Sequence, residues 1–151
     1  MHLLSGNKKT GQCVHLMNLD ADWCAGSFAC QRYYDGYLMS NLDDGHMPQL
    51  LDYMINYARY PRKVIQLHVG LQYHHDVKNY VWQGGFGVLN ESQPERHRWC
   101  EGYPNRDHGN VVFSVLPRTG GKQCFKNEDH YDSFFWYFCQ KRACDAKNYC
   151  P

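Results

Sequence analysis

Eight cysteines have the most evident chemistry in this 151-residue sequence, since each can form a disulfide bond or bind a metal. They are scattered along the chain, and none forms the paired Cys-x-x-Cys spacing of zinc sites. Scattered cysteines in an even number are typical of small proteins whose disulfides form in an oxidising compartment. We therefore expect a secreted, extracellular protein with disulfide bonds, in a pairing that the spacing alone leaves open. The cysteines stand at positions 13, 24, 30, 100, 124, 139, 144 and 150.

Two further features bear on secretion. The opening residues, Met-His-Leu-Leu, are too few for a signal peptide, so we expect the chain to start as a mature protein. Asn90 begins an Asn-Glu-Ser triplet, which is an acceptor sequence for N-glycosylation and fits secretion. Such triplets also arise by chance, so an unmodified Asn90 stays an alternative.

Histidines and arginines form two other candidate binding groups. A His-His-Asp run at 74–76 could hold a transition metal, although histidines in a turn are more often only solvated. Arg96 and Arg98 precede Trp99 and make a small basic, aromatic patch. A patch of this kind suits a sulfated glycan or an acidic protein surface, and it is also common on surfaces that bind nothing. The sequence leaves both alternatives open for each group.

No motif in the sequence is typical of an enzyme. A Gly-x-Ser-x-Gly motif, a His-Glu-x-x-His motif and a phosphate-binding glycine loop are all absent. The 16 basic and 15 acidic residues give a formal charge of +1, far below that of proteins that bind nucleic acid through bulk charge. No apolar run approaches the 18 or so residues of a membrane helix. We therefore expect no enzymatic activity, no nucleic-acid partner and no membrane insertion.

The elements that must position these residues begin with a helix at about 22–32. Asp20 or Asp22 suits its N-cap, because a carboxylate can accept hydrogen bonds from the free N–H groups of the first turn. An Asp-Gly pair at 35–36 is expected to stop it. Helical spacing predicts an apolar face made of Trp23, Phe28 and Cys30.

A second helix is predicted from Pro48 to the residue before Pro61. Proline suits a first helical turn, where its missing N–H does no harm, and it ends a helix that reaches it. Apolar residues recur between them at intervals of three or four, which indicates a face toward the core: Leu51, Met54, Ile55 and Ala58.

Strands and long loops are predicted for the remainder, where β-branched and aromatic residues gather in short runs. The clearest candidates are residues 64–69, 80–82, 111–116 and 134–138. The segment 87–109 is rich in Gly, Pro, Asn and charge, so we expect it to be loop. Two helices followed by strands indicate an α+β fold, and the length suits a single domain, 1–151.

The order of these segments resembles a C-type lectin-like domain over about 11–142, followed by a cysteine-containing tail at 143–151. Matching pieces in the right order carry the likeness: an opening strand at 11–16, a helix with Trp23 and Cys30, a second helix at 48–57, His68-Val69-Gly70-Leu71 for the core Trp-Ile-Gly-Leu, Tyr80–Gly85 for Trp-x-Trp-x-Asp-Gly, Trp99-x-x-Gly102-x-Pro104-Asn105 for Trp-x-x-Gly-Glu-Pro-Asn, and Tyr137-Phe138-Cys139 for the closing Phe-Ile-Cys. The resemblance implies two helices flanking antiparallel sheets, and a ligand-binding long-loop region at about 84–129. It also implies a hydrogen-bonded core histidine at His68, where the family has an apolar residue.

The resemblance also implies a disulfide pattern. The family joins its first helix to its last strand, which implies Cys30–Cys139. Its second bridge has no counterpart here, and Cys100–Cys124, in the long-loop neighbourhood, could replace it. The family's first and last strands are antiparallel neighbours, which favours Cys13–Cys144 and leaves Cys24–Cys150. A free or intermolecular cysteine is the alternative for the extra pairs.

Members of this family that bind sugar do so through calcium, which prefers six to eight oxygen ligands that include carboxylates. The resemblance implies metal ligands at Asn105, Asn127 and Glu128. Tyr103 replaces the family's glutamate, however, and a neutral phenol is a poor calcium ligand. The Asn-Asp pair has become Asn-Glu, which shifts the carboxylate, and a lysine stands where the family has tryptophan. We therefore expect no cofactor, with a displaced calcium site as the alternative, and a cis peptide bond before Pro104, as is typical of the family.

The resulting hypothesis is a secreted recognition module that works without calcium. Its partner is expected to be an extracellular protein, including other copies in an oligomer or larger assembly. The alternative is a carbohydrate, bound through a displaced calcium site or through basic residues on an anionic glycan. The expected ligand-binding residues are Arg96, Arg98, Trp99, Tyr103, Asn105, Asp107, Asn127 and Glu128.

Overall fold

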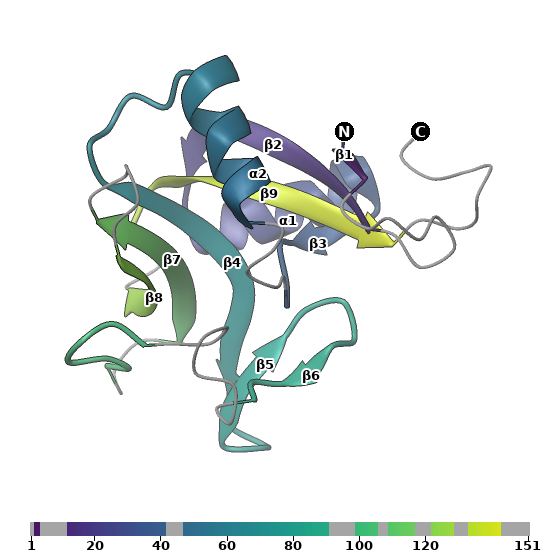
Figure 1. Ribbon diagram of the computed structural model, residues 1–151. Coiled ribbons are helices and arrows are strands. Elements are labelled where there is room, and N and C mark those ends of the chain that lie inside the picture. Colours follow the sequence, from purple (N-terminus) through teal and green to yellow (C-terminus); the bar gives the residue numbers. More distant parts are fainter. Residues whose placement is uncertain are drawn as a thin grey trace.

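A computed structural model describes residues 2–3, 12–41, 47–90, 99–105, 109–116, 122–128 and 133–142. Two α-helices lie against a strongly curved sheet, as the sequence predicts for an α+β fold (Figure 1). The elements are β1 (His2–Leu3), β2 (Gln12–Ala21), α1 (Trp23–Tyr34), β3 (Tyr37–Leu38), α2 (Met47–Asp52), the π-helix η1 (Tyr53–Tyr57), β4 (Ile65–His74), β5 (Asn79–Trp82), β6 (Gly87–Val88), β7 (Asn110–Leu116), β8 (Lys122–Glu128) and β9 (Phe135–Arg142).

Sheet pairing brings the two ends of the described chain together. The main path runs β1-β2-β9-β4-β5-β6, and β7 joins β4 to β8 on a second branch. β2 and β9 pair antiparallel, as the resemblance implied, whereas β9 and β4 pair in parallel. β4 is the long strand at the centre of Figure 1, and it contacts β9 at one end and β5 at the other. It therefore connects the terminal strands to the loop region.

Helix α1 is bounded by the residues predicted to cap it. Asp22 accepts a hydrogen bond from the backbone N–H of Ala25 at 2.7 Å, and Asp35 ends the helix in a left-handed conformation with φ of 51°. The prediction for Phe28 was wrong, because 63% of its side chain is exposed. Phe28 comes five positions after Trp23, and at 3.6 residues per turn this places it about 140° around the helix. The buried face is made of Trp23, Gly26 and Cys30.

The second predicted helix is present but changes its hydrogen bonding halfway. α2 buries Leu50 and Leu51, and η1 then buries Met54. The N–H of Ala58 donates to the carbonyl of Tyr53, five residues back, at 3.1 Å, which defines a π-helical turn. Apolar spacing indicates which side of a helix is buried, but it does not distinguish a π-turn from an α-turn.

Two disulfides are formed between described cysteines. Cys30–Cys139 joins α1 to β9, and Cys100–Cys124 joins the loop at 99–105 to β8, so both predicted pairs are confirmed. Cys13 is also disulfide-bonded. Its predicted partner Cys144, and also Cys150, lie outside the described residues. Pairing of Cys24 was predicted wrongly, because it is a free, exposed thiol on α1. That thiol is on the outer side of the helix, away from the buried face that holds Cys30.

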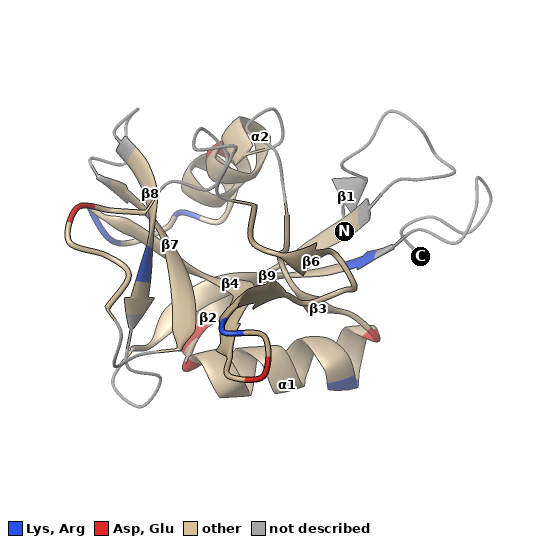
Figure 2. Cartoon of the chain, turned by 90° about the horizontal axis from the view of Figure 1, so that it is seen from below, with Lys and Arg blue, Asp and Glu red and all other residues tan. Residues whose placement is uncertain are grey.

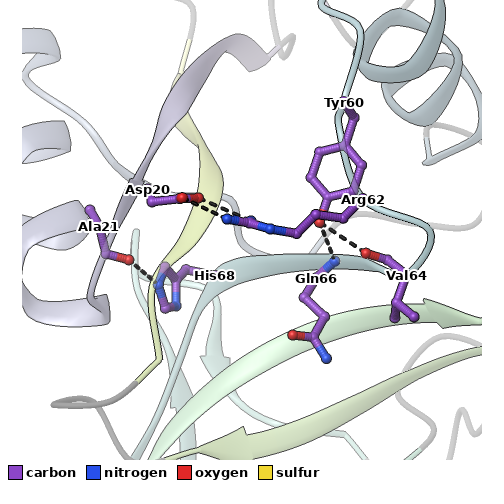
Figure 3. A network of polar contacts seen from close by, with 7 residues as sticks. All are labelled: Asp20, Ala21, Tyr60, Arg62, Val64, Gln66 and His68. Atoms are coloured by element: carbon purple, nitrogen blue, oxygen red, sulfur yellow. Dashed lines mark hydrogen bonds and ion pairs between the residues drawn. The ribbon is translucent and has the colours of Figure 1, made fainter.

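A group of polar contacts ties the end of β2 to the segment before β4 (Figure 3). Arg62 donates to both carboxylate oxygens of Asp20, at 2.6 and 3.0 Å. The hydroxyl of Tyr60 donates to the carbonyl of Val64 at 3.0 Å and accepts from the N–H of Gln66 at 3.3 Å. The Asp20 and Arg62 side chains are about 40% exposed, so we expect this ion pair to contribute less than about 1 kcal/mol.

His68 is the hydrogen-bonded core histidine that was predicted. It is 1% exposed on β4, and its Nε2 lies 2.6 Å from the carbonyl oxygen of Ala21 at the end of β2. A carbonyl can only accept, so Nε2 carries the proton. Burial lowers the pKa of His68, and the Ala21 carbonyl and the negative charge of Asp22 only partly offset this effect. The ring is therefore held neutral in the folded protein.

The lowered pKa of His68 predicts an acid-dependent loss of stability. The unfolded chain takes up this proton near the ordinary histidine pKa of about 6.5, whereas the folded chain takes it up at a lower pH. Stability is thus fully present above about pH 6.5 and is lost as pH falls toward the folded pKa, by at most about 1.4 kcal/mol per pH unit. Urea unfolding between pH 5 and 8 should show this slope, and His68→Gln should flatten it. His74→Gln, at an exposed position, should keep the wild-type slope; equal slopes for wild type and His68→Gln would contradict the assignment.

Candidate functional site

The loop at 99–105 is fastened to β8 at its beginning. Trp99 forms a parallel bridge with Phe125, and the N–H of Cys100 donates to the Phe125 carbonyl at 2.8 Å. The Cys100–Cys124 disulfide adds a covalent link, with 4.9 Å between the two Cα atoms. A turn then closes where the N–H of Tyr103 donates to the carbonyl of Cys100 at 3.0 Å. The start of the loop is therefore held to β8 by a backbone hydrogen bond and by a disulfide bond.

Asn127 holds the other end of the loop. Its Oδ1 accepts a hydrogen bond from the backbone N–H of Asn105 at 2.6 Å. Its Nδ2 donates to the carbonyl of Asn105 and, at 3.0 Å, to the hydroxyl of Tyr80. The Asn127 side chain is 1% exposed, and Phe125, two positions earlier on β8, is also buried. Both ends of the amide are thus engaged in pinning the loop to the sheet.

Tyr103, Pro104 and Asn105 form the outer part of the loop. The peptide bond between Tyr103 and Pro104 is cis, as the resemblance implied. Tyr103 is half-buried, whereas Pro104 and Asn105 are exposed. Gly102, just before them, has φ of 84°, a conformation that a residue with a side chain rarely adopts. Tyr103, Pro104 and Asn105 therefore form the solvent-facing tip of the loop.

Aromatic rings of β5 and β8 pack against Trp99 at the start of the loop. The Trp99 and Tyr80 ring centroids are 4.9 Å apart, and the Trp99 and Phe125 centroids are 6.3 Å apart. Trp99 is only partly buried, and it packs against the main hydrophobic core. Burial raises the pKa of Tyr80, although the hydrogen bond from Asn127 acts in the opposite direction. The Tyr80 hydroxyl therefore stays protonated and neutral at physiological pH.

A pocket of about 420 Å³ lies beside this loop, and sequence reasoning missed it. Its described lining residues are Tyr73 of β4, His75 of the following turn, Tyr80 of β5 and Pro104 of the loop. Tyr73 and Tyr80 are direct cross-strand partners in the β4–β5 hairpin. Tyr73 and Tyr80 stand at equal distances from a four-residue turn, and this spacing could have predicted that they are neighbours across the hairpin. The position of Pro104 in the lining could not be predicted in this way, because the loop at 99–105 is distant in the sequence.

The structure brings together only part of the predicted ligand-binding set. Trp99, Tyr103, Asn105 and Asn127 meet at the loop. The backbone of Glu128 is described and pairs with Asn110 of β7. The predicted positions 96, 98 and 107 lie outside the described residues. The binding role of all eight residues remains a prediction.

Comparisons with known proteins agree on the fold. No family model matches the sequence. A Caenorhabditis elegans protein, C-type lectin domain-containing protein 160, is 26% identical over 98% of this chain, which spans 24% of that relative's length. The crystal structure of the C-type lectin CEL-I from Cucumaria echinata superposes with a TM-score of 0.65 at 16% identity, over 91% of this chain and 93% of that one. This chain has the C-type lectin-like fold.

A mammalian C-type lectin-like domain is equally similar. The murine dendritic cell inhibitory receptor 2 domain, solved in complex with an N-glycan, superposes with a TM-score of 0.64 at 16% identity, over 91% of this chain and 99% of that one. The resemblance inferred from the sequence is thus confirmed at the level of the fold. At these identities the solved structures establish the fold of the present C-type lectin-like domain and not its ligand.

Of the predicted calcium ligands Asn105, Asn127 and Glu128, the side chain of Glu128 lies outside the described part of the structure. Calcium requires several oxygens, with carboxylates among them. The Asn127 oxygen already accepts the Asn105 N–H, and the phenol of Tyr103 stands in place of a carboxylate. Among the described residues, no three His, Cys, Asp or Glu side chains come together as metal ligands. The same finding covers the His-His-Asp run at 74–76, which forms no such group with its described neighbours.

Proposed function

We propose that this C-type lectin-like domain is a recognition module that binds its partner without calcium. The observation that carries the proposal is the Asn127 amide, which is buried and engaged by the loop backbone and by Tyr80. A calcium ion at the loop would have to compete with the Asn105 N–H for the same oxygen. Breaking these buried hydrogen bonds costs about 1–3 kcal/mol for each group left without a partner.

Calorimetric titration of the chelator-stripped protein with calcium tests this proposal. We expect no binding heat up to millimolar calcium, and a melting temperature that chelator does not change. Tight ligand binding to the folded state raises stability, so a calcium-dependent melting temperature would reveal a site independently of heat. Binding with millimolar or tighter affinity would overturn the proposal and would favour a displaced calcium site that uses residues such as Asn105 and Glu128.

We also propose that the protein works outside the cell. Support comes from the disulfides Cys30–Cys139 and Cys100–Cys124 and from the bonded Cys13, because such bonds persist in oxidising compartments. Asn90 is exposed, as an N-glycosylation site must be. Separately, no helix among the described residues is long and apolar enough to cross a membrane.

A protein is the first candidate partner. Exposed aromatic side chains favour it, because Tyr and Phe are enriched where proteins meet. Phe28 and Tyr33 on α1 are 63% and 73% exposed, and Tyr57 on η1 is 75% exposed. In the view of Figure 2, segments of both charge signs are scattered over the described elements. We therefore expect binding to a protein partner to depend only weakly on ionic strength.

A carbohydrate is the second candidate, and the pocket of Tyr73, His75, Tyr80 and Pro104 favours it. Aromatic walls with a few hydrogen-bonding groups are typical of small-ligand sites. The described lining consists of two phenol rings, an imidazole and a proline ring. The alternative basic route, through the arginines at 96 and 98, concerns positions outside the described residues.

A further inference from the structure

Three rings in the pocket beside the loop meet at steep angles. The ring centroids of Tyr73 and Tyr80 are 5.3 Å apart, with 71° between the ring planes. The centroids of Tyr73 and His75 are 5.1 Å apart, with 80° between the planes. Rings that meet nearly at right angles and line the same pocket form corners in it, where one ligand group can contact two of them at once. Pro104 adds a further side of the pocket from the loop at 99–105.

The two tyrosines are held in place before any ligand arrives. Tyr80 is 7% exposed, its hydroxyl accepts a hydrogen bond from Asn127, and its ring lies 4.9 Å from that of Trp99. The backbone of Tyr73 pairs with Tyr80 across the hairpin, and its N–H donates to the carbonyl of Gly109 at 2.9 Å. Rings that are already positioned need little reordering on binding, so less entropy is lost.

The electrostatics of aromatic rings indicate which ligand suits this lining. The face of an aromatic ring carries partial negative charge and its edge partial positive charge. Burial raises the pKa of Tyr80, so its hydroxyl stays protonated and the ring acts through its face rather than as a phenolate. A ring face attracts a cation but replaces little of its hydration, so it favours a weakly hydrated cation. A quaternary ammonium group is such a cation, because methyl groups surround its charge.

Charges of the neighbouring turn give a cation no net attraction. Asp76 and Lys78 are both exposed in the turn at 75–78, and they have opposite signs. The formal charge of the whole chain is +1, which does not steer cations toward the protein. We therefore assign selectivity for a cation to the rings. The volume of about 420 Å³ is within the usual range for small-ligand pockets, about 300–1,000 Å³.

We propose that this pocket is an aromatic cage that binds a trimethylammonium group against the rings of Tyr73, His75 and Tyr80. The inference goes beyond the proposed calcium-independent recognition and does not require it. Two sources share this chemistry: choline, free or in a lipid headgroup, and a trimethylated lysine of a protein. A sugar at the same position would be selected through its hydroxyls and not through a positive charge, so the two kinds of ligand can be told apart.

A pair of matched ligands tests whether charge is recognised. Choline and 3,3-dimethyl-1-butanol have the same shape and hydroxyl group, but a neutral carbon replaces the ammonium nitrogen in the second. Saturation-transfer difference NMR of the intact chain in EDTA, at pH 8, measures both. We expect transfer to the methyl protons of choline, with a millimolar Kd, and binding of the neutral alcohol that is about three- to thirtyfold weaker. Equal binding of the two, or no binding of choline, would overturn the inference.

Variants of the lining test whether this pocket is the site. Tyr73→Phe keeps the ring and should retain most of the choline binding, whereas Tyr73→Leu should weaken it about three- to tenfold. His75→Ala should also weaken binding, and His74→Ala provides its matched control, because His74 is an exposed neighbour that does not line the pocket. Both histidines are exposed, so these two variants are expected to fold even if Tyr73→Leu does not. Equal choline binding by the His74 and His75 variants would exclude this pocket.

Two further probes distinguish the sources of the trimethylammonium group. Sedimentation with phosphatidylcholine vesicles, and not with phosphatidylethanolamine vesicles, would assign the ligand to a lipid headgroup. Preference for a trimethyllysine peptide over the same peptide with unmodified lysine would assign it to a protein. Choline binding without either result would assign a free small molecule, and all three results support the cage. Failure of choline to bind, in EDTA and in calcium alike, would reject the cage alone, because titration with calcium tests the proposed function separately.

Discussion

Removing the Cys30–Cys139 disulfide is expected to lower the free energy of unfolding by about 4–5 kcal/mol. The two residues are 109 positions apart, so the bond closes a loop that contains most of the chain. In the chain-entropy model, a longer closed loop removes more conformations from the unfolded state. Both cysteines are also buried, between α1 and β9. Urea unfolding of the Cys30→Ala/Cys139→Ala variant measures this effect.

Two other cysteine positions supply the controls. Cys100 and Cys124 are separated by 24 positions, so removing both should cost about 3–3.5 kcal/mol, less than the longer loop. Cys24 is free and exposed, so Cys24→Ser should leave the stability within about 0.5 kcal/mol of wild type. Mass mapping of the native protein should find Cys24 alkylated and Cys30 protected. If removing Cys100–Cys124 lowers the free energy of unfolding more than removing Cys30–Cys139 does, local packing and not loop length determines the size of the effect.

Local signals in the sequence predicted α1 and most of the sheet well. Asp22 and Asp35 mark the ends of α1 because capping depends only on neighbouring residues. The strand at 64–69 was recognised from its β-branched residues, although it extends to His74. Phe28 was misplaced because three apolar residues in a short window do not define a helical face when one of them is exposed.

Strand β8 was missed because its sequence, Lys-Gln-Cys-Phe-Lys-Asn-Glu, contains a single large apolar residue. It pairs with β7 along its whole length through backbone hydrogen bonds, which carry no sequence signature. Its inward positions are Phe125 and Asn127, so one of the two buried side chains is polar. The resemblance identified Asn127 as important but could not indicate that its amide holds the loop. That role depends on Asn105, which is 22 residues away in the sequence.

Replacing Asn127 by alanine is expected to lower the free energy of unfolding by about 2–4 kcal/mol, because buried groups would lose their partners. The N–H and carbonyl of Asn105 and the hydroxyl of Tyr80 each hydrogen-bond to this amide. The backbone N–H of Asn105 should also exchange with solvent faster, because the variant lacks the amide oxygen that accepts its hydrogen bond. Urea unfolding and hydrogen exchange measure the two effects.

Gln123 gives the matched control, since it is an exposed amide on the same strand. Gln123→Ala should change stability by no more than about 0.5 kcal/mol and should leave exchange at Asn105 unchanged. A loss that is equal in the two variants would mean that Asn127 contributes strand propensity rather than loop anchoring. If Asn127→Ala also weakens binding of the partner while it raises exchange at Asn105, the amide links the sheet to the recognition surface. Asn127, which the resemblance implied as a calcium ligand, would then position the loop through hydrogen bonds to Asn105 and Tyr80 without an ion.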